Sequence, residues 1–162
     1  PPRSTLFPYT TLFRSGELLS DALVGLIRER AGEIAALYLA DATANPTTPA
    51  YHRCPREGLF RRAETVLLQL GRWLAGGAAA QEMRAFYRAL GAERRAQGFP
   101  LHEVLSSFML LRKHVWTFAH GQVIMAHPID LYRVLELDRR LVLFFDRAMY
   151  HAALGFAQER GG

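Results

Sequence analysis

Apolar residues recur every three or four positions along almost the whole chain, which is the spacing of one face of an α-helix. No stretch alternates between apolar and polar residues in the way that a half-buried strand does. The pattern predicts a helix over about 17–43, a second from Pro55 to Gly76, a third over about 79–97, a fourth from Pro100 through Phe118, and a last one from Pro128 through Phe156.

Proline and glycine mark the ends of these segments. Proline fits the first turn of a helix, because the N–H group that it lacks has no partner there. Glycine adopts the backbone conformation that often ends a helix. The openings are Pro55, Pro100 and Pro128, the ends are Gly76, Gly77 and Gly98, and Pro46 and Pro49 interrupt the longest loop. The chain is therefore expected to be all-α, a single-domain bundle of about five helices, with a globin-like arrangement as one alternative.

The last predicted helix is apolar on more than one face. Leu137, Leu141, Phe144 and Phe145 do not fit on a single stripe. A helix of this kind is either central in its own domain or packed against a second copy of itself. A homodimer contact through this helix is therefore one of the two interpretations.

Residues 5–15 read TLFPYTTLFRS, which is the in-frame translation of a common short-read sequencing adapter. An eleven-residue coincidence is negligible, so Pro1–Ser15 is interpreted as adapter-derived and not native. Residues 16–162 are then the helical domain, and the chain is expected to be a fragment of a longer protein.

The charge of the chain does not indicate a nucleic-acid partner. The formal net charge is +5 and the pI about 9.9, but two of the basic residues, Arg3 and Arg14, lie in the adapter-derived part. Lys113 is the only lysine, and the arginines alternate with acids without forming a basic run. No native apolar run approaches the roughly 20 residues that span a bilayer. The lone Cys54 excludes an internal disulfide and suits a reducing cytoplasm.

One long stretch carries a family resemblance. Residues 87–118 read YRALGAERRAQGFPLHEVLSSFMLLRKHVWTF. Its marks are Gly91, Arg94, Arg95, Ala96 and Gly98, then Phe99-Pro100-Leu101, then Glu103-Val104-Leu105, and Leu110 through Trp116; the segment 144–150 adds a closing phrase. The stretch resembles the N-terminal module of the RsbT co-antagonist proteins of bacterial stressosomes, and similar modules stand at the N-termini of many soluble bacterial histidine kinases.

The resemblance implies a cytoplasmic sensory or regulatory module that dimerises and passes a signal to a C-terminal output domain. The residues themselves explain much of the motif as a corner between two helices. Gly98 lets the chain leave one helix, Pro100 opens the next, and Glu103 meets the positive end of its dipole. A partner or ligand surface is the alternative interpretation of the same residues.

The histidines give no catalytic signature. His102 precedes Glu103, as in a kinase phosphoacceptor box, but Ser107 stands where that box has proline, so a surface position is expected. His114 flanks an apolar stripe and is the best candidate among the histidines for a haem ligand. Otherwise neither a cofactor nor a metal site is expected, and no catalytic set can be assembled from the spacings.

Arg112, Lys113 and Trp116 form the densest group of cationic and aromatic residues. We consider them a candidate partner surface, with an ordinary helix surface as the alternative. Three functions remain: a non-catalytic sensory module that relays a signal through a helical dimer, a haem or small-ligand binding protein of globin-like build, and a stand-alone interaction or effector-binding domain.

Overall fold

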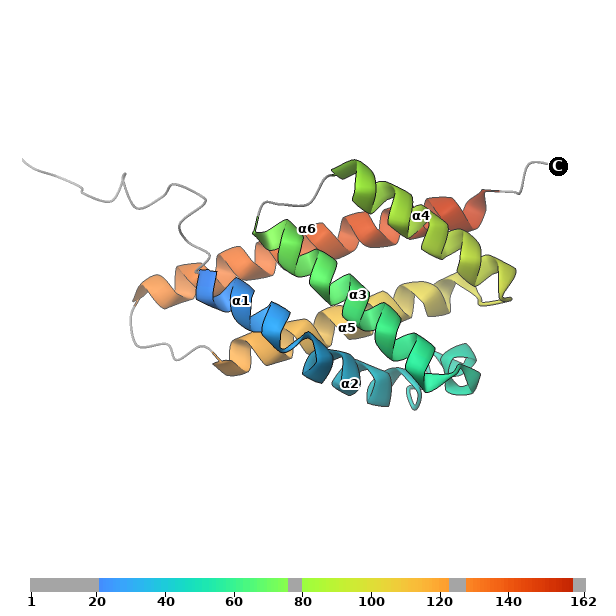
Figure 1. Ribbon diagram of the computed structural model, residues 1–162, viewed down its shortest axis with the longest axis horizontal. Helices are drawn as coiled ribbons and strands as arrows, with labels where there is room; N and C mark the ends of the chain where they lie inside the picture. The colour runs from blue at the N-terminus through green and yellow to red at the C-terminus, as the bar shows by residue number, and fades with distance from the viewer. Residues whose placement is uncertain (1–20, 76–79, 123–127, 159–162) are drawn as a thin grey trace, which may run out of the picture.

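The computed structural model describes residues 21–75, 80–122 and 128–158 (Figure 1). Within these ranges the chain forms six α-helices and one 3-10 helix, and no strand. The elements are α1 (Asp21–Glu29), α2 (Ala31–Ala42), η2 (Pro49–Arg53), α3 (Arg56–Leu74), α4 (Ala80–Ala96), α5 (Leu101–Gln122) and α6 (Pro128–Ala157). The all-α class predicted from the apolar spacing is confirmed.

The first predicted helix, over 17–43, is two helices where the structure describes it. Arg30 separates α1 from α2 and leaves helical geometry, with φ −101° and ψ 15°. Backbone hydrogen bonds still cross the break, from Arg30 N to Leu26 O and from Ile34 N to Arg30 O. The apolar stripe also continues through it, because Ile27 and Ile34 are both fully buried. The pattern therefore gave no sign of a break, and the part of this prediction before residue 21 lies outside the described residues.

The helices pack in two layers (Figure 1). Helices α5 and α6 lie side by side at the back, and α1, α2, α3 and α4 cover them on the viewer's side. Aromatic rings fill the centre, where Tyr87 meets Phe108 and Phe144 edge-on at centroid distances of 5.8 and 6.1 Å. The largest fully buried side chains are Tyr51, Tyr87, Phe144, Phe145, Ile27, Ile34, Leu67, Leu70, Leu137, Leu141, Val104 and Val115.

The four apolar residues expected on more than one face of the last helix lie on one face instead. Each is at most 1% exposed, and they are Leu137, Leu141, Phe144 and Phe145. Their spacing of i, i+4, i+7 and i+8 forms a single helical stripe, so this expectation is wrong. The exposed apolar residues of α6 are others, among them Leu135 and Val142.

Helices α4 and α6 approach each other backbone to backbone. A Cβ atom added at Gly91 would lie 2.8 Å from the carbonyl carbon of Ala152 and 2.9 Å from the amide nitrogen of Phe156. One added at Gly155 would lie 2.6 Å from the Cα of Arg88. Only glycine leaves room for this crossing, so these two positions set the distance between the helices.

The corner between α4 and α5 has the form that the motif predicts. Gly98 adopts φ 81°, the left-handed conformation that favours glycine. The amide of Phe99 donates to the carbonyl of Arg94 at 3.0 Å, and the amide of Gly98 to that of Arg95 at 2.9 Å. These two bonds form a Schellman cap, which satisfies the last carbonyls of α4. The carbonyl oxygen of Pro100 then accepts hydrogen bonds from the amides of Glu103 and Val104, in the first turn of α5.

Candidate functional site

The predicted partner surface lies on the outer side of α5, but its two cations are paired within the chain. Arg112 Nη1 is 3.5 Å from Asp146 Oδ1 on α6, and Lys113 Nζ is 2.5 Å from Asp41 Oδ2 on α2. The indole of Trp116 is 45% exposed. The part of this group that remains exposed to a partner is therefore mainly the indole ring of Trp116.

His114, the candidate haem ligand, points to the same carboxylate. Its Nε2 lies 2.9 Å from Asp41 Oδ2. Hydrogen bonds from Asn45, Lys113 and His114, in that order of effect, hold the pKa of Asp41 well below its usual range, although burial acts in the opposite direction. A haem iron would have to compete with this carboxylate for the ring nitrogen. Among the described residues, no group of three or more His, Cys, Asp and Glu side chains could hold a metal ion.

Two further histidines, His102 and His120, lie in positions that do not suggest a catalytic or ligand-binding role. His102 is exposed in the first turn of α5, the surface position expected for it. His120 Nε2 lies 3.0 Å from Asp138 Oδ1 and so ties α5 to α6. Its ring also stacks on Trp116 at a centroid distance of 4.0 Å.

Apolar side chains are exposed together on the outer side of α5 and α6. Two of them, Met109 and Trp116, lie on α5. The contacts Arg112–Asp146 and His120–Asp138 bridge the two helices beside them. The exposed apolar members on α6 are Leu131, Tyr132, Leu135, Val142, Leu143 and Tyr150. We call this set, with Met109 and Trp116, the α5–α6 face. Several exposed apolar side chains on neighbouring helices make this face a candidate interaction surface.

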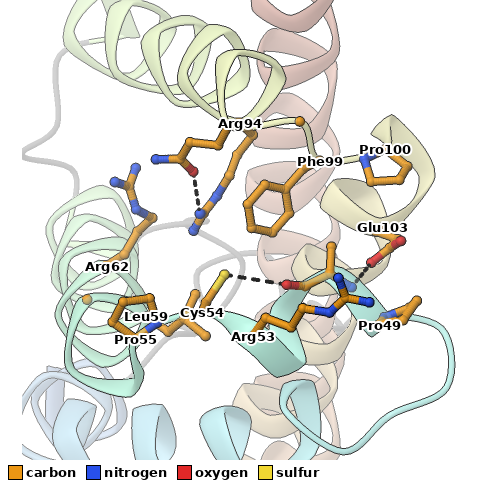
Figure 2. Close-up of a pocket in the computed structure, with 14 residues that line it drawn as sticks. Pro49, Arg53, Cys54, Pro55, Leu59, Arg62, Arg94, Phe99, Pro100 and Glu103 are labelled. Atoms are coloured by element: carbon orange, nitrogen blue, oxygen red, sulfur yellow. Dashed lines mark hydrogen bonds between the residues drawn. The ribbon is translucent and has the colours of Figure 1, made fainter.

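The corner motif lines a groove of about 730 Å³ at the other end of α5 (Figure 2). The groove lies between η2, the start of α3, the end of α4 and the start of α5. Arg94, Gly98, Phe99, Pro100 and Glu103, all part of the motif, contribute to its wall. The sequence suggested a ligand surface only as the alternative to a plain corner. The residues that complete the groove come from 49–62 and have no motif of their own.

Acidic groups in and beside the groove already have partners. Glu103 is only 5% exposed, and its Oε2 accepts the backbone N–H of Ala50 at 2.6 Å. The carboxylate of Glu93 accepts two hydrogen bonds from Arg62, from Nη1 to Oε2 at 2.9 Å and from Nη2 to Oε1 at 2.7 Å. Glu103 thus connects η2 to α5 by a hydrogen bond. The sequence predicted only its favourable interaction with the helix dipole of α5.

Cys54, the single cysteine, also lines the groove. Burial raises the pKa of its thiol, while the positive charge of Arg94 acts in the opposite direction. Its Sγ lies 3.5 Å from the carbonyl oxygen of Ala50, to which it donates. A protonated thiol that donates to a carbonyl is not an activated nucleophile.

Comparison with known proteins gives one match. A family model described as the RsbT co-antagonist protein rsbRD N-terminal domain matches residues 19–161. No curated protein and no solved structure matches the chain. The matched region contains every described helix, the α4–α5 corner and the α5–α6 face. None of the described helices is long and apolar enough to cross a membrane.

Proposed function

Since the chain belongs to the family of RsbT co-antagonist rsbRD N-terminal domains, we propose that it is a non-catalytic sensory module of a cytoplasmic signalling protein. In this proposal the module pairs with a second copy through the α5–α6 face and relays a signal to a C-terminal output domain. The exposed apolar side chains of α6 carry the proposal, because they leave this helix a surface for a partner outside its own domain.

The exposed side of α6 supports pairing with a second copy. Leu135 is 54% exposed and Val142 45%, although both belong to a helix whose opposite side is fully buried. Burying a leucine or valine completely contributes about 1.5–3 kcal/mol, so each half-exposed side chain stands to gain about 1 kcal/mol. Arg139 and Asp146 are also exposed among these apolar residues. A face that carries both charge signs can match a symmetry-related copy of itself.

The opposite side of α6 supports a relay. There the helix meets α4 through Gly91 and Gly155, with no side chain between the two backbones. Arg95 of α4 also donates to the carbonyl oxygens of Phe156, Ala157 and Gln158 at the end of α6, at 3.1–3.4 Å. Such tight packing transmits a displacement instead of absorbing it. A shift of α4 would therefore move α6, and with it the dimer contact and whatever follows α6.

Light scattering on the purified chain tests the proposal. We expect the wild-type chain to be a dimer at tens of micromolar, and Leu135→Glu to be a monomer with an unchanged circular dichroism spectrum, because Leu135 contributes little to its own core. The variant should melt somewhat lower than the wild type, because it loses the stabilisation that the dimer contributes. Leu68→Glu is the matched control, since Leu68 is 45% exposed on α3 in the other layer. It should remain dimeric.

A wild-type chain that stays monomeric at high micromolar concentration would contradict the proposal. So would a Leu135→Glu chain that dimerises as well as the wild type. Dissociation by Leu68→Glu alone would place the contact on another face.

A further inference from the structure

The groove at the α4–α5 corner contains a buried positive charge that no acid of the described chain neutralises. Arg94 is only 7% exposed, and within the described part of the chain its guanidinium makes a single hydrogen bond, from Nη1 to Gln97 Oε1 at 2.9 Å. No carboxylate among the described residues lies within ion-pair distance of it. A buried charge is costly unless a counter-charge accompanies it.

The surroundings of Arg94 compensate only in part. Its guanidinium lies 5.3 Å from the ring centre of Tyr51 and 4.6 Å from that of Phe99, and both rings attract a cation. The two nearby acids have other partners. Glu103 accepts a hydrogen bond from the amide of Ala50, and Glu93 pairs with Arg62. Figure 2 shows the Arg94 guanidinium pointing into the groove between Arg62 and Phe99. Its remaining donors are thus available to a ligand.

The rest of the groove suits a small molecule with an apolar body. Its volume of about 730 Å³ lies within the usual range for small-molecule pockets, about 300–1,000 Å³. Leu59, Phe99 and the prolines Pro49, Pro55 and Pro100 provide an apolar wall. Arg53 lies at the same groove and has no ion-pair partner among the described residues, so it adds a second positive charge that no acid of these residues neutralises, whereas Arg62 is paired with Glu93.

We propose that this groove is a binding site for a small organic acid. The carboxylate of the ligand would accept two parallel hydrogen bonds from Arg94, the geometry for which a guanidinium is suited. Arg53 would attract the anion on entry, and the apolar part of the ligand would pack on Phe99 and Leu59. The helices α3 and α5 begin at the groove, and the positive ends of their dipoles favour an anion there. Binding at this site requires neither self-association nor an output domain.

Cys54 provides a direct assay, since it is the only thiol of the chain and lies in the groove. The measurement is the rate at which Cys54 reacts with the uncharged reagent 4,4′-dithiodipyridine. The probes are 4-phenylbutyrate and octanoate, with 4-phenylbutyramide as a matched ligand that lacks the charge. We expect both acids to slow the reaction at least fivefold in a saturable manner, and the amide to have little effect.

Variants locate the effect at Arg94. Arg94→Gln should abolish the protection by the acids, and Arg53→Gln should weaken it several-fold. Arg61→Gln removes an exposed arginine of α3 that does not line the groove, and it should behave as the wild type. Circular dichroism checks the folding of each variant. If Arg94→Gln does not fold, Arg53→Gln and the comparison of acid with amide in the wild-type chain still decide the question.

Three results would overturn the proposal. The first is a reaction rate that neither acid changes at concentrations up to about 20 mM, a range that includes very weak binding. The second is equal protection by the acid and by the amide. The third is full protection by the acids in a folded Arg94→Gln chain. The Leu135→Glu chain separates this proposal from the proposed dimer. If this chain is monomeric and the acids still protect Cys54 as they do in the wild type, the groove binds the acids without the dimer.

Discussion

Replacing Gly91 by alanine tests the backbone contact between α4 and α6, on which the proposed relay depends. The added Cβ would lie 2.8 Å from the carbonyl carbon of Ala152, and nearer still to its oxygen. The obstructing atoms belong to the backbone of a long helix, so no side chain can rotate out of the way. The two helices would have to separate.

The expected loss of stability follows from two opposing effects. Overpacking of a well-packed interior costs about 1–3 kcal/mol, and a backbone obstacle places this case near the upper end. Alanine is about 1 kcal/mol better than glycine inside a helix. The net destabilisation is therefore about 2 kcal/mol, and at roughly 2–4 °C per kcal/mol for a chain of this size the melting temperature should fall by about 4–8 °C.

The assay is thermal unfolding followed by circular dichroism at 222 nm, together with urea unfolding. Gly32→Ala is the matched control, because Gly32 is a half-buried glycine of α2 whose added Cβ would make only an ordinary contact, 3.9 Å from Phe60 Cζ. Gly58→Ala is a second control, since nothing lies within 4 Å of the added atom. Both controls should stay within about 1 kcal/mol of the wild type or exceed it. A Gly91→Ala chain as stable as Gly32→Ala would refute the backbone contact.

Two further predictions concern single charged groups. Arg95→Ala removes the donor to the last carbonyls of α6, so the amides of the last turn should exchange hydrogen faster and stability should fall by about 0.5–1 kcal/mol; unchanged exchange in that turn would contradict the contact. Hydrogen bonds from Arg139 and then Arg140 lower the pKa of Glu136 from 4.5 to about 2. A lowered pKa stabilises the fold fully above the unfolded value and progressively less as the pH falls through the folded value. Glu136→Gln should therefore cost about 1 kcal/mol at pH 7, discounted for solvent screening, and the difference from the wild type in urea unfolding should shrink between pH 5 and pH 2. Glu57→Gln, on the exposed side of α3, is the control and should show no such dependence.

The apolar spacing predicted the helices well because burial and spacing are directly linked. Val104, Leu111 and Val115 lie on one stripe of α5 and are all buried. The same link failed at Arg30, where the stripe continues while the backbone departs from helical geometry. It also did not distinguish the two sides of α6, since Leu135 has helical spacing but is 54% exposed. Spacing identifies an apolar face without showing which element covers it.

The sequence predicted the corner between α4 and α5 but not the whole groove of which this corner is one part. Gly98 and Pro100 predicted the corner, because their backbone preferences act locally. Tyr51 and Cys54 carry no local signal, and they reach Arg94 only when η2 folds against α5. An arginine near the end of a helix is ordinarily explained by the helix dipole. Only the packed structure shows that this arginine is buried and that no carboxylate of the described residues pairs with it.

Fluorescence quenching of Trp116 tests the central claim, self-association through the α5–α6 face, most directly. The chain has two tryptophans, and Trp73→Phe leaves Trp116, 45% exposed on that face, as the only reporter. We predict that the acrylamide quenching constant falls by at least half as the protein concentration rises from about 1 to 100 µM, and that adding Leu135→Glu removes this dependence. A quenching constant that is the same at both concentrations would contradict the account, because the ring would then remain exposed at a concentration where a dimer should cover it.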